Sequence, residues 1–294
     1  MTPPYSLVVA TMNRPDSLEA ALVSLAGQTH APTAVIVVDA STDRLTAELC
    51  QRWEDRLPIR CVSATVRSAA CQRNQGAELV ETPLIGFMDD DVVLPPATLR
   101  MLAEPFADCE VGGVAGRIVG LSHSVPRGLL WGYYRCQAGY SHLHYGGRVI
   151  GPAINLLPAF DQEAGPLVAA EWLHSTLVLY RRELFERERF PIFDGYSFLE
   201  DAHLSYRIGR THRLYFRKDA PYAHNSQPSS AKSDRRALAR MIVRHQRTMA
   251  RDVLGLRGFT LLWKLTLHRL FQTIAVLRSK DQDRWQSVRG FWEP

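Results

Sequence analysis

Short apolar runs alternate with amphipathic segments over the first hundred residues. Residues 6–10 and 34–38 have the length and apolar content of buried strands, and residues 59–63 and 84–88 predict a third and a fourth strand. Between and after these runs, apolar residues at helical spacing predict helices at about 16–27, 42–53, 68–80 and 95–106. Strands that alternate with helices in this way form a mainly parallel sheet with crossover helices, so the pattern predicts an α/β fold.

The pattern is less regular in the second half. It predicts strands at 168–172, 177–180 and 213–216, a short helix at 181–187 and a helix over 199–208, with His224 in the loop after the last strand. Residues 120–170 are rich in Gly, Tyr, Trp and His. Two interpretations of this segment stay open, namely mobile loops over a site and buried irregular structure.

The last part of the chain is strongly basic. From Ala231 onward, 14 Lys and Arg stand against 5 Asp and Glu, whereas residues 1–230 carry a net charge of −4. Five arginines recur at steps of three and four and therefore share one helical stripe, while Leu238, Ile242, Met249 and Val253 fall on the other side: Arg236, Arg240, Arg244, Arg247 and Arg251. We therefore predict a basic amphipathic helical tail over 231–294.

Two roles for this tail stay open. Residues 259–277 are apolar but include Lys264, His268 and Arg269, which makes a membrane-spanning helix unfavourable. The tail can lie in the interface of an anionic membrane, or it can pack on the body of the protein or on a second subunit of a homodimer. It carries no recognisable nucleic-acid motif, so we expect no nucleic-acid partner.

Composition sets the broad class of protein. The chain has 294 residues, of which 46% are hydrophobic and 22% charged, as in a globular protein with a substantial core. Its five cysteines are an odd number without a CxxC pair, which fits a reducing compartment. The first residues lack the features of a signal peptide. We therefore expect a cytoplasmic protein, working at the inner face of the membrane if the tail binds lipid.

Polar residues follow the predicted strands at the points where the apolar runs stop. Ligands of open α/β sheets bind beyond the carboxyl ends of the strands, and here these ends carry Thr11, Asn13, Arg14, Asp39 and Asp89-Asp90-Asp91. The first loop is neither a G-x-G-x-x-G nor a P-loop motif, which disfavours dinucleotide binding and P-loop chemistry. A nucleotide pocket of another kind is the prediction.

The three consecutive aspartates are the strongest chemical signal. No Lys or Arg lies between Glu81 and Leu99, so no neighbour in the sequence neutralises them. Oxygen ligands gathered at a strand end suit Mg²⁺ or Mn²⁺ bridging a diphosphate. The alternative is a solvated acidic turn.

Four further positions have both a chemical and an ordinary structural interpretation. Glu200-Asp201 at a helix start can supply a general base or simply a favourable charge at the helix N-terminus. His224 can complete a metal site or be a structural histidine. Asp39 can accept a hydrogen bond from a nucleobase, and Arg73 can reach a base carbonyl or a phosphate or lie on a helix surface.

Five segments in this order resemble family 2 glycosyltransferases of the GT-A fold over about residues 5–226. They read SLVVATMNRPDSLEAALVSLAGQ, VIVVDASTD, RNQGAELV, FMDDDVVLPPATL and FLEDAHLSYRIGRTHRLYFRKDAPYAHN. The resemblance implies a Rossmann-like sheet flanked by helices, a divalent metal (Mn²⁺ or Mg²⁺), a nucleotide-sugar donor with UDP favoured, and inversion at the anomeric carbon. The predicted catalytic domain is 1–230, with a nucleotide-binding half (about 5–110) and an acceptor half (111–230).

The resemblance also assigns roles to residues. Asp201, with Glu200 beside it, matches the general base, and Asp89, Asp91 and His224 match the metal ligands. The positions implied to bind the donor are Thr11, Asn13, Arg14, Asp39, Arg73, Asn74, Asp89 and Asp90. Trp172 and His174 fall where relatives shape the pocket for the donor sugar and the acceptor, although a Gly-rich turn of many relatives is replaced here by Leu173-His174-Ser175.

The expected activity is sugar transfer to a hydroxyl of a glycan or a lipid-linked acceptor. A sugar-nucleotide nucleotidyltransferase is an alternative, but such enzymes usually need a Gly-rich basic first loop, and TMNRPDS supplies only Arg14. A non-catalytic protein that binds sugar or nucleic acid is the other alternative. It would not need Asp89, Asp91, Asp201 and His224 together.

Overall fold

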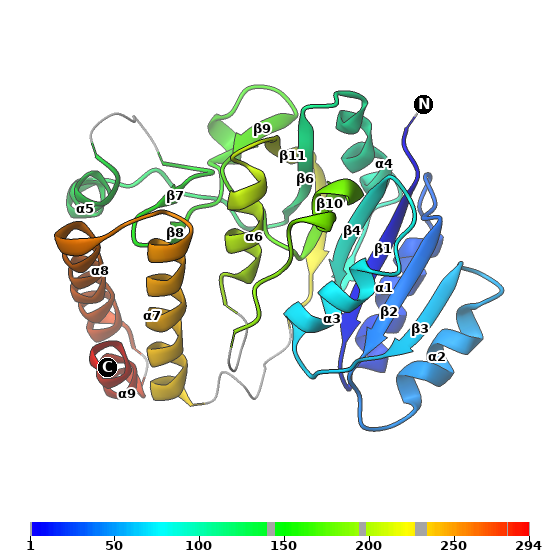
Figure 1. Ribbon diagram of the computed structural model, residues 1–294, viewed down its shortest axis with the longest axis horizontal. Helices are drawn as coiled ribbons and strands as arrows, with labels where there is room; N and C mark the ends of the chain where they lie inside the picture. Colours follow the sequence, from blue (N-terminus) through cyan, green and yellow to red (C-terminus); the bar gives the residue numbers. More distant parts are fainter. Residues whose placement is uncertain (1, 140–144, 194–197, 227–233, 281, 294) are drawn as a thin grey trace.

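A mixed sheet with helices on both faces forms the body of the molecule (Figure 1). The computed structural model describes residues 2–139, 145–193, 198–226, 234–280 and 282–293. Within these residues the sheet has nine strands in the order β3-β2-β1-β4-β10-β6-β11-β5, with β9 paired to β11. The prediction of an α/β fold with a C-terminal helical extension is confirmed.

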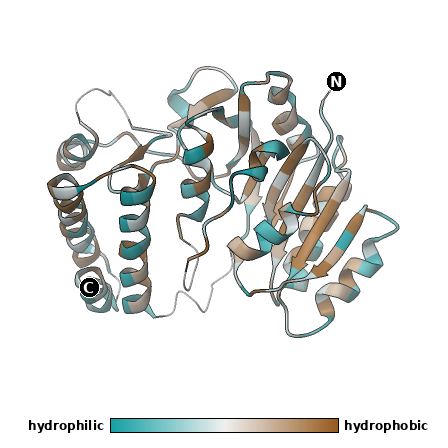
Figure 2. Ribbon diagram, in the orientation of Figure 1, coloured by the Kyte–Doolittle hydropathy of each residue, from teal (hydrophilic) through white to brown (hydrophobic). Residues whose placement is uncertain are grey.

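The first half of the sheet is parallel, as the alternating pattern predicted. Its strands are β1 (Tyr5–Thr11), β2 (Ala34–Asp39), β3 (Ile59–Ser63) and β4 (Leu84–Asp89), and its helices are α1 (Pro15–Ala26), α2 (Leu45–Trp53) and α3 (Ala69–Ala77). Leu7 and Val9 of β1 pack on one face with α1 and α2, while Val8 packs on the other face with α3. Burial on both faces explains why β1, β2 and β4 are mainly apolar runs, drawn mostly as hydrophobic in Figure 2, whereas β3 at the sheet edge is partly exposed and includes Arg60.

The second half of the sheet mixes directions, because β10 runs antiparallel to both β4 and β6. Its strands are β5 (Val92–Val93), β6 (Val111–Ile118), β9 (Leu167–Ala170), β10 (Leu177–Arg181) and β11 (Arg213–His224), and β7 (Val149–Ile150) pairs with β8 (Ile154–Asn155) in a separate hairpin. Its helices are α4 (Thr98–Ala103), α5 (Gly128–Ala138) and α6 (Glu200–Ile208), with 3₁₀ turns η1 (Glu104–Ala107), η2 (Phe160–Gln162) and η3 (Arg182–Glu186).

The prediction that the last strand ends at residue 216 is wrong, and the difference matters for the site. Strand β11 continues to His224, past an irregularity in its pairing with β6 between Arg217 and Pro221. The polar residues 217–219 interrupt the apolar alternation there and hide the continuation in the sequence. Its end pairs with β5, so that His224 lies opposite Val92. His224 is therefore held in the sheet rather than in a loop.

Strand β6 and helix α5 had no clear sequence signal. Strand β6 contains three glycines, and an added Cβ at Gly113 would lie 2.6 Å from the Tyr180 ring. Helix α5 buries Tyr133 and Tyr134 in an apolar cluster with Tyr145, packed against Phe271 of the C-terminal region. These aromatic residues are thus part of a core, which favours the second of the two interpretations left open for this segment.

The C-terminal region consists of three helices, α7 (Arg235–Asp252), α8 (Gly258–Arg278) and α9 (Arg284–Trp292). Met249 and Val253 pack with Trp172 and Leu199 in one apolar cluster, so this region is docked on the body. The arginine stripe of α7 is exposed, as its spacing predicted. Among the described helices, none has the length and apolar character needed to cross a bilayer. The predicted domain boundary at 230/231 lies outside the described residues.

Close packing of α3 on the sheet depends on Gly76. A Cβ at this position would lie 2.3 Å from Cγ1 of Val8 and 3.1 Å from Cγ2 of Val38. We expect Gly76→Ala to lower the free energy of unfolding by about 1–3 kcal/mol through overpacking, although helix propensity alone favours alanine. Urea denaturation checks this. Gly27→Ala is the matched control, because its nearest neighbour is 3.7 Å away; equal stability of the two variants would contradict the packing argument.

Candidate active site

The carboxyl ends of the parallel strands bring the predicted polar residues to one edge of the sheet. Thr11 ends β1 opposite Asp39 at the end of β2, and Asp89 ends β4 opposite Ala10. The side chain of Gln72 donates to the Thr11 carbonyl at 2.9 Å and to the Val38 carbonyl at 2.8 Å, tying these strand ends to α3. Nothing in the sequence pattern distinguished Gln72.

Asp90, the middle aspartate, faces the protein interior. It is 5% exposed, and its Oδ2 accepts a hydrogen bond of 2.7 Å from the Thr11 hydroxyl. Burial raises the pKa of Asp90 to about 6, although Thr11 and Arg14 act in the opposite direction. Asp90 and Thr11 are thus bonded to each other and connect the acidic turn to β1. The resemblance had implied both residues in the donor-binding site, and that role stays a prediction.

Asp89 and Asp91 meet His224. One ligand atom from each of the three residues lies within 4.8 Å of the others, a spacing at which the three could hold a divalent cation. Oδ1 of Asp91 is 3.1 Å from Nε2 of His224 but is buried without a well-formed hydrogen bond. Such an oxygen, beside a carboxylate and an imidazole, fits Mn²⁺ or Mg²⁺, so the donor set agrees with the sequence prediction.

Arg14 and His224 contact this acidic turn from distant parts of the sequence. Nη1 of Arg14 lies 3.4 Å from both Asp90 and Asp91. Burial alone would raise the pKa of Asp91, but His224 and Arg14 outweigh it and the pKa is lowered. Asp91 is therefore held as a carboxylate, the form that binds a metal.

Arg73 joins the two halves of the site. Its side chain is 8% exposed, with Nη2 2.8 Å from Asp89 and Nη1 3.1 Å from Glu200. Burial alone would lower the pKa of Arg73, but these carboxylates outweigh it and the pKa is raised. The resemblance placed Arg73 beside the nucleobase and diphosphate, and this role stays a prediction; in the structure its guanidinium connects the end of β4 to the start of α6.

Asp201 lies next to this ion pair at the start of α6. Its Oδ1 accepts from the Ala202 amide at 2.7 Å. Burial, and then the neighbouring charge of Glu200, raise the pKa of Asp201 to about 7, while Arg73 acts in the opposite direction. A carboxylate with a pKa near neutrality is a stronger proton acceptor than an ordinary aspartate.

The backbone before α6 is held in an unusual conformation. Leu199 has φ 68 and is 4% exposed. The left-handed region is unfavourable for leucine, so the packing of Leu199 against α7 must hold it there. Ser205 adds a second constraint, since it accepts from the Leu173 amide at 2.9 Å and donates to the Asp201 carbonyl at 2.6 Å.

The loops after β1 and β2 are linked around Asp39. Its Oδ1 accepts from the Ser41 amide and hydroxyl at 2.9 and 2.5 Å. The backbone N–H of Asn13 donates to the Ser41 hydroxyl at 2.7 Å, and the side-chain Oδ1 of Asn13 accepts from the backbone N–H of Thr42 at 3.1 Å. Asn13 thus orders the loop that would face a nucleobase, and Ser41 is a part of the site that the sequence analysis missed.

Three other predicted site residues are engaged within the protein. The side-chain amide of Asn74 donates to the Phe190 carbonyl and accepts from the Phe190 N–H, both at 2.9 Å. The Trp172 indole donates to the Leu156 carbonyl at 3.0 Å and is 5% exposed. His174 packs between Phe216 and Tyr222, and burial lowers its pKa to about 4, so it is neutral. The roles of these residues toward donor sugar and acceptor stay predictions.

Removal of the Arg73 guanidinium should leave two carboxylates without their cation. We expect Arg73→Met to lower the free energy of unfolding by about 3 kcal/mol, the cost of breaking a buried ion pair. Urea denaturation measures the change. Arg52→Met in α2 is the control, because Arg52 is exposed and its loss should change stability by less than about 0.5 kcal/mol. Similar stabilities of the two variants would show that Arg73 does not support the site.

Comparison with known proteins finds similarity to one family over the first part of the chain. Residues 6–135 match the model of glycosyl transferase family 2. The chain is 39% identical over 99 residues to validoxylamine A glucosyltransferase of Streptomyces hygroscopicus subsp. limoneus, covering 32% of this chain and 22% of that protein. It is 34% identical over 94 residues to hyaluronan synthase of Pasteurella multocida, covering 31% and 10%. The similarity therefore spans less than a quarter of these curated relatives.

Solved structures share the fold over nearly the whole chain. The mannosyltransferase PcManGT from Pyrobaculum calidifontis, in complex with GDP-Man and Mn²⁺, superposes with a TM-score of 0.57 at 19% identity, covering 99% of this chain and 85% of that one. S. aureus TarS in complex with UDP-GlcNAc gives a TM-score of 0.57 at 19% identity, covering 98% and 79%. Residues 6–135 thus match the glycosyl transferase family 2 model, the curated relatives of this part are glycosyltransferases, and the shared architecture shows that the chain has the GT-A fold.

Proposed function

We propose that this protein is a metal-dependent, inverting glycosyltransferase that moves a sugar from a nucleoside diphosphate to a hydroxyl of a glycan or lipid-linked acceptor. The observation that carries the proposal is the meeting of two sites at one sheet edge. Asp89, Asp91 and His224 form a candidate cation site. Arg73 connects Asp89 to Glu200, and hence to the candidate base Asp201.

The donor nucleotide belongs at the parallel half of the sheet in this proposal. Asp39 stands at the end of β2 with its side chain ordered by Ser41, where a carboxylate can accept from a nucleobase N–H. We favour UDP, which the TarS complex with UDP-GlcNAc supports. GDP is the competing nucleotide, since PcManGT is in complex with GDP-Man. dTDP is the third candidate.

The divalent ion would be held by Asp89, Asp91 and His224. When bound, Mn²⁺ or Mg²⁺ neutralises the negative charge that develops on a departing diphosphate. The chain itself prepares these ligands, because the contact with His224 and Arg14 keeps Asp91 ionised. Asp90 instead stays beneath the turn on Thr11 and would not touch the ion.

Asp201 would act as the base. In a direct displacement, the acceptor oxygen attacks the anomeric carbon on the face opposite the departing nucleotide, and the acceptor proton passes to Asp201. One base and one attack invert the anomeric centre. The Ala202 amide and the Ser205 hydroxyl fix the position of Asp201, and burial raises its affinity for the proton.

The proposal is tested first by donor binding. We expect one of UDP, GDP or dTDP to raise the Tm of the full chain in the presence of Mn²⁺, because a ligand that binds the folded state stabilises it by mass action. Asp91→Asn should abolish the dependence on Mn²⁺, since it removes one ligand charge. Asp108→Asn, at an exposed position away from the site, is the control. A shift that persists unchanged in excess chelator, or no shift with any nucleotide, would refute the proposal.

The pH profile tests the base. Because the pKa of Asp201 is about 7 and the carboxylate is the active form, kcat/KM should rise between about pH 6 and pH 8. Asp201→Asn should reduce kcat roughly 10²–10⁴-fold and remove this rise, while nucleotide binding is retained. Sugar transfer by this variant at the wild-type rate would exclude Asp201 as the base.

A further inference from the structure

The outer side of α8 is a mainly apolar surface, interrupted by Thr266 and Thr273. Six large side chains recur at steps of three, four and seven residues and all are at least one-third exposed: Phe259, Leu262, Trp263, Leu270, Ile274 and Leu277. Phe259 is 80% exposed. These six residues are called the α8 face below. Trp285 and Trp292 of α9 add two exposed indoles, 59% and 45%.

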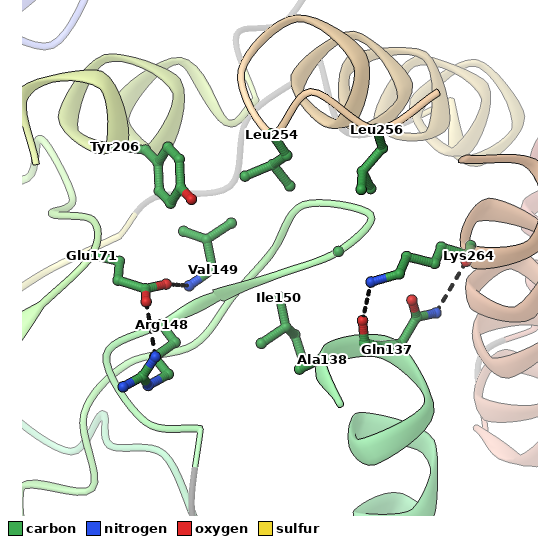
Figure 3. A pocket seen from close by; sticks show the side chains of 11 residues that line it. Gln137, Ala138, Arg148, Val149, Ile150, Glu171, Tyr206, Leu254, Leu256 and Lys264 are labelled. Carbon is green, nitrogen blue, oxygen red and sulfur yellow. Dashed lines mark hydrogen bonds and ion pairs between the residues drawn. The ribbon is translucent and has the colours of Figure 1, made fainter. Parts of the chain in front are cut away.

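The opposite side of α8 is fixed to the body, so the helix cannot turn this face inward. Lys264 donates to the Gln137 carbonyl, and the Gln137 side chain returns a hydrogen bond of 3.0 Å to the Lys264 carbonyl (Figure 3). His268 is 6% exposed and lies between Tyr133 and Gln246. The Tyr133 and Phe271 rings stack with centroids 4.0 Å apart.

Figure 3 shows the pocket that lies on this anchored side of α8. Lys264 and Leu256 line a pocket of about 220 Å³ together with residues of α5, β7 and α6. The inward-facing residues of α8 are thus engaged in hydrogen bonds, in aromatic stacking and in the lining of this pocket. The α8 face has no corresponding cover within the described residues.

The charged residues within α8 and at its two ends are basic, whereas Asp283 and Glu293 lie at the two ends of the neighbouring α9. Helix α8 contains no acidic residue. Arg257 precedes its first turn, and Arg278 and Lys280 follow at its other end, all three exposed. An apolar helix surface with cationic ends and interfacial tryptophans complements a bilayer that carries negative headgroups.

We propose that the α8 face binds the surface of an anionic lipid bilayer, with its apolar side chains among the upper acyl chains and the flanking cations on lipid phosphates. A second copy of this chain fits less well. Two α8 faces packed in antiparallel would bring Arg257 of one copy close to Arg278 and Lys280 of the other, where like charges repel.

The proposal changes which helix of the tail contacts lipid. In α7, the side opposite the arginine stripe is occupied, because Val243 packs with Phe291 of α9 and Met249 packs with Trp172 of the body. Helix α7 is mainly hydrophilic in Figure 2, whereas α8 beside it carries hydrophobic residues. Arg236 and Arg240 also pair with Glu293. The inserted surface is therefore α8, and the α7 arginines add only long-range attraction.

Vesicle flotation of the full chain tests the proposal. We expect binding to phosphatidylcholine vesicles that contain phosphatidylglycerol and much weaker binding to phosphatidylcholine alone. The double variant Phe259→Ser/Ile274→Ser should bind the anionic vesicles at least about tenfold more weakly, because two side chains leave the apolar phase. The control Val23→Ser/Leu45→Ser removes side chains that are 54% and 53% exposed elsewhere, and it should bind as the wild type does.

The remaining outcomes overturn the proposal. They are absence of wild-type binding, equal binding by the α8 double variant, and a dimer in light scattering that this variant dissociates without any vesicle binding by the wild type. The nucleotide-induced Tm shift should be the same in both double variants. The two experiments are therefore independent. Flotation tests only the lipid proposal, and the nucleotide-induced Tm shift tests only the proposed glycosyltransferase function.

Discussion

Repulsion between carboxylates is the constraint on which this structure depends. Five acidic side chains, Asp89, Asp90, Asp91, Glu200 and Asp201, gather where β4 ends and α6 begins. The buried guanidinium of Arg73 lies between the two groups and contacts both Asp89 and Glu200. Without a cation at this point, two acidic segments more than 100 residues apart in the chain would repel each other across the gap. The same contact brings the candidate cation site next to the candidate base.

The three aspartates of one turn have different environments, and therefore different uses. Asp90 is buried on Thr11 and its pKa is raised, whereas Asp91 contacts Arg14 and His224 and its pKa is lowered. A single acidic triplet thus supplies one structural anchor and two potential metal ligands.

The C-terminal helices contribute to the site as well as to the outer surface. Met249 of α7 and Val253 directly after this helix pack in one cluster with Leu199 and Ala202, the residues on either side of Glu200-Asp201. This packing holds Leu199 in its left-handed conformation, and with it the first turn of α6. The tail is therefore part of the support of the candidate base, and it is also the element whose outer helix carries the α8 face.

The sequence by itself determined the parallel half of the sheet, its strand ends and the arginine stripe, because each depends on periodicity or on residue type within a short window. It also indicated Asp89, Asp91, Asp201 and His224, by resemblance. Only the tertiary structure decided that Arg73 pairs with carboxylates, that Asp90 turns inward, that β11 continues to His224 and that α8 leaves its apolar side uncovered. These facts depend on contacts between residues far apart in the chain, and on which helix face a neighbour buries, and no local pattern encodes either.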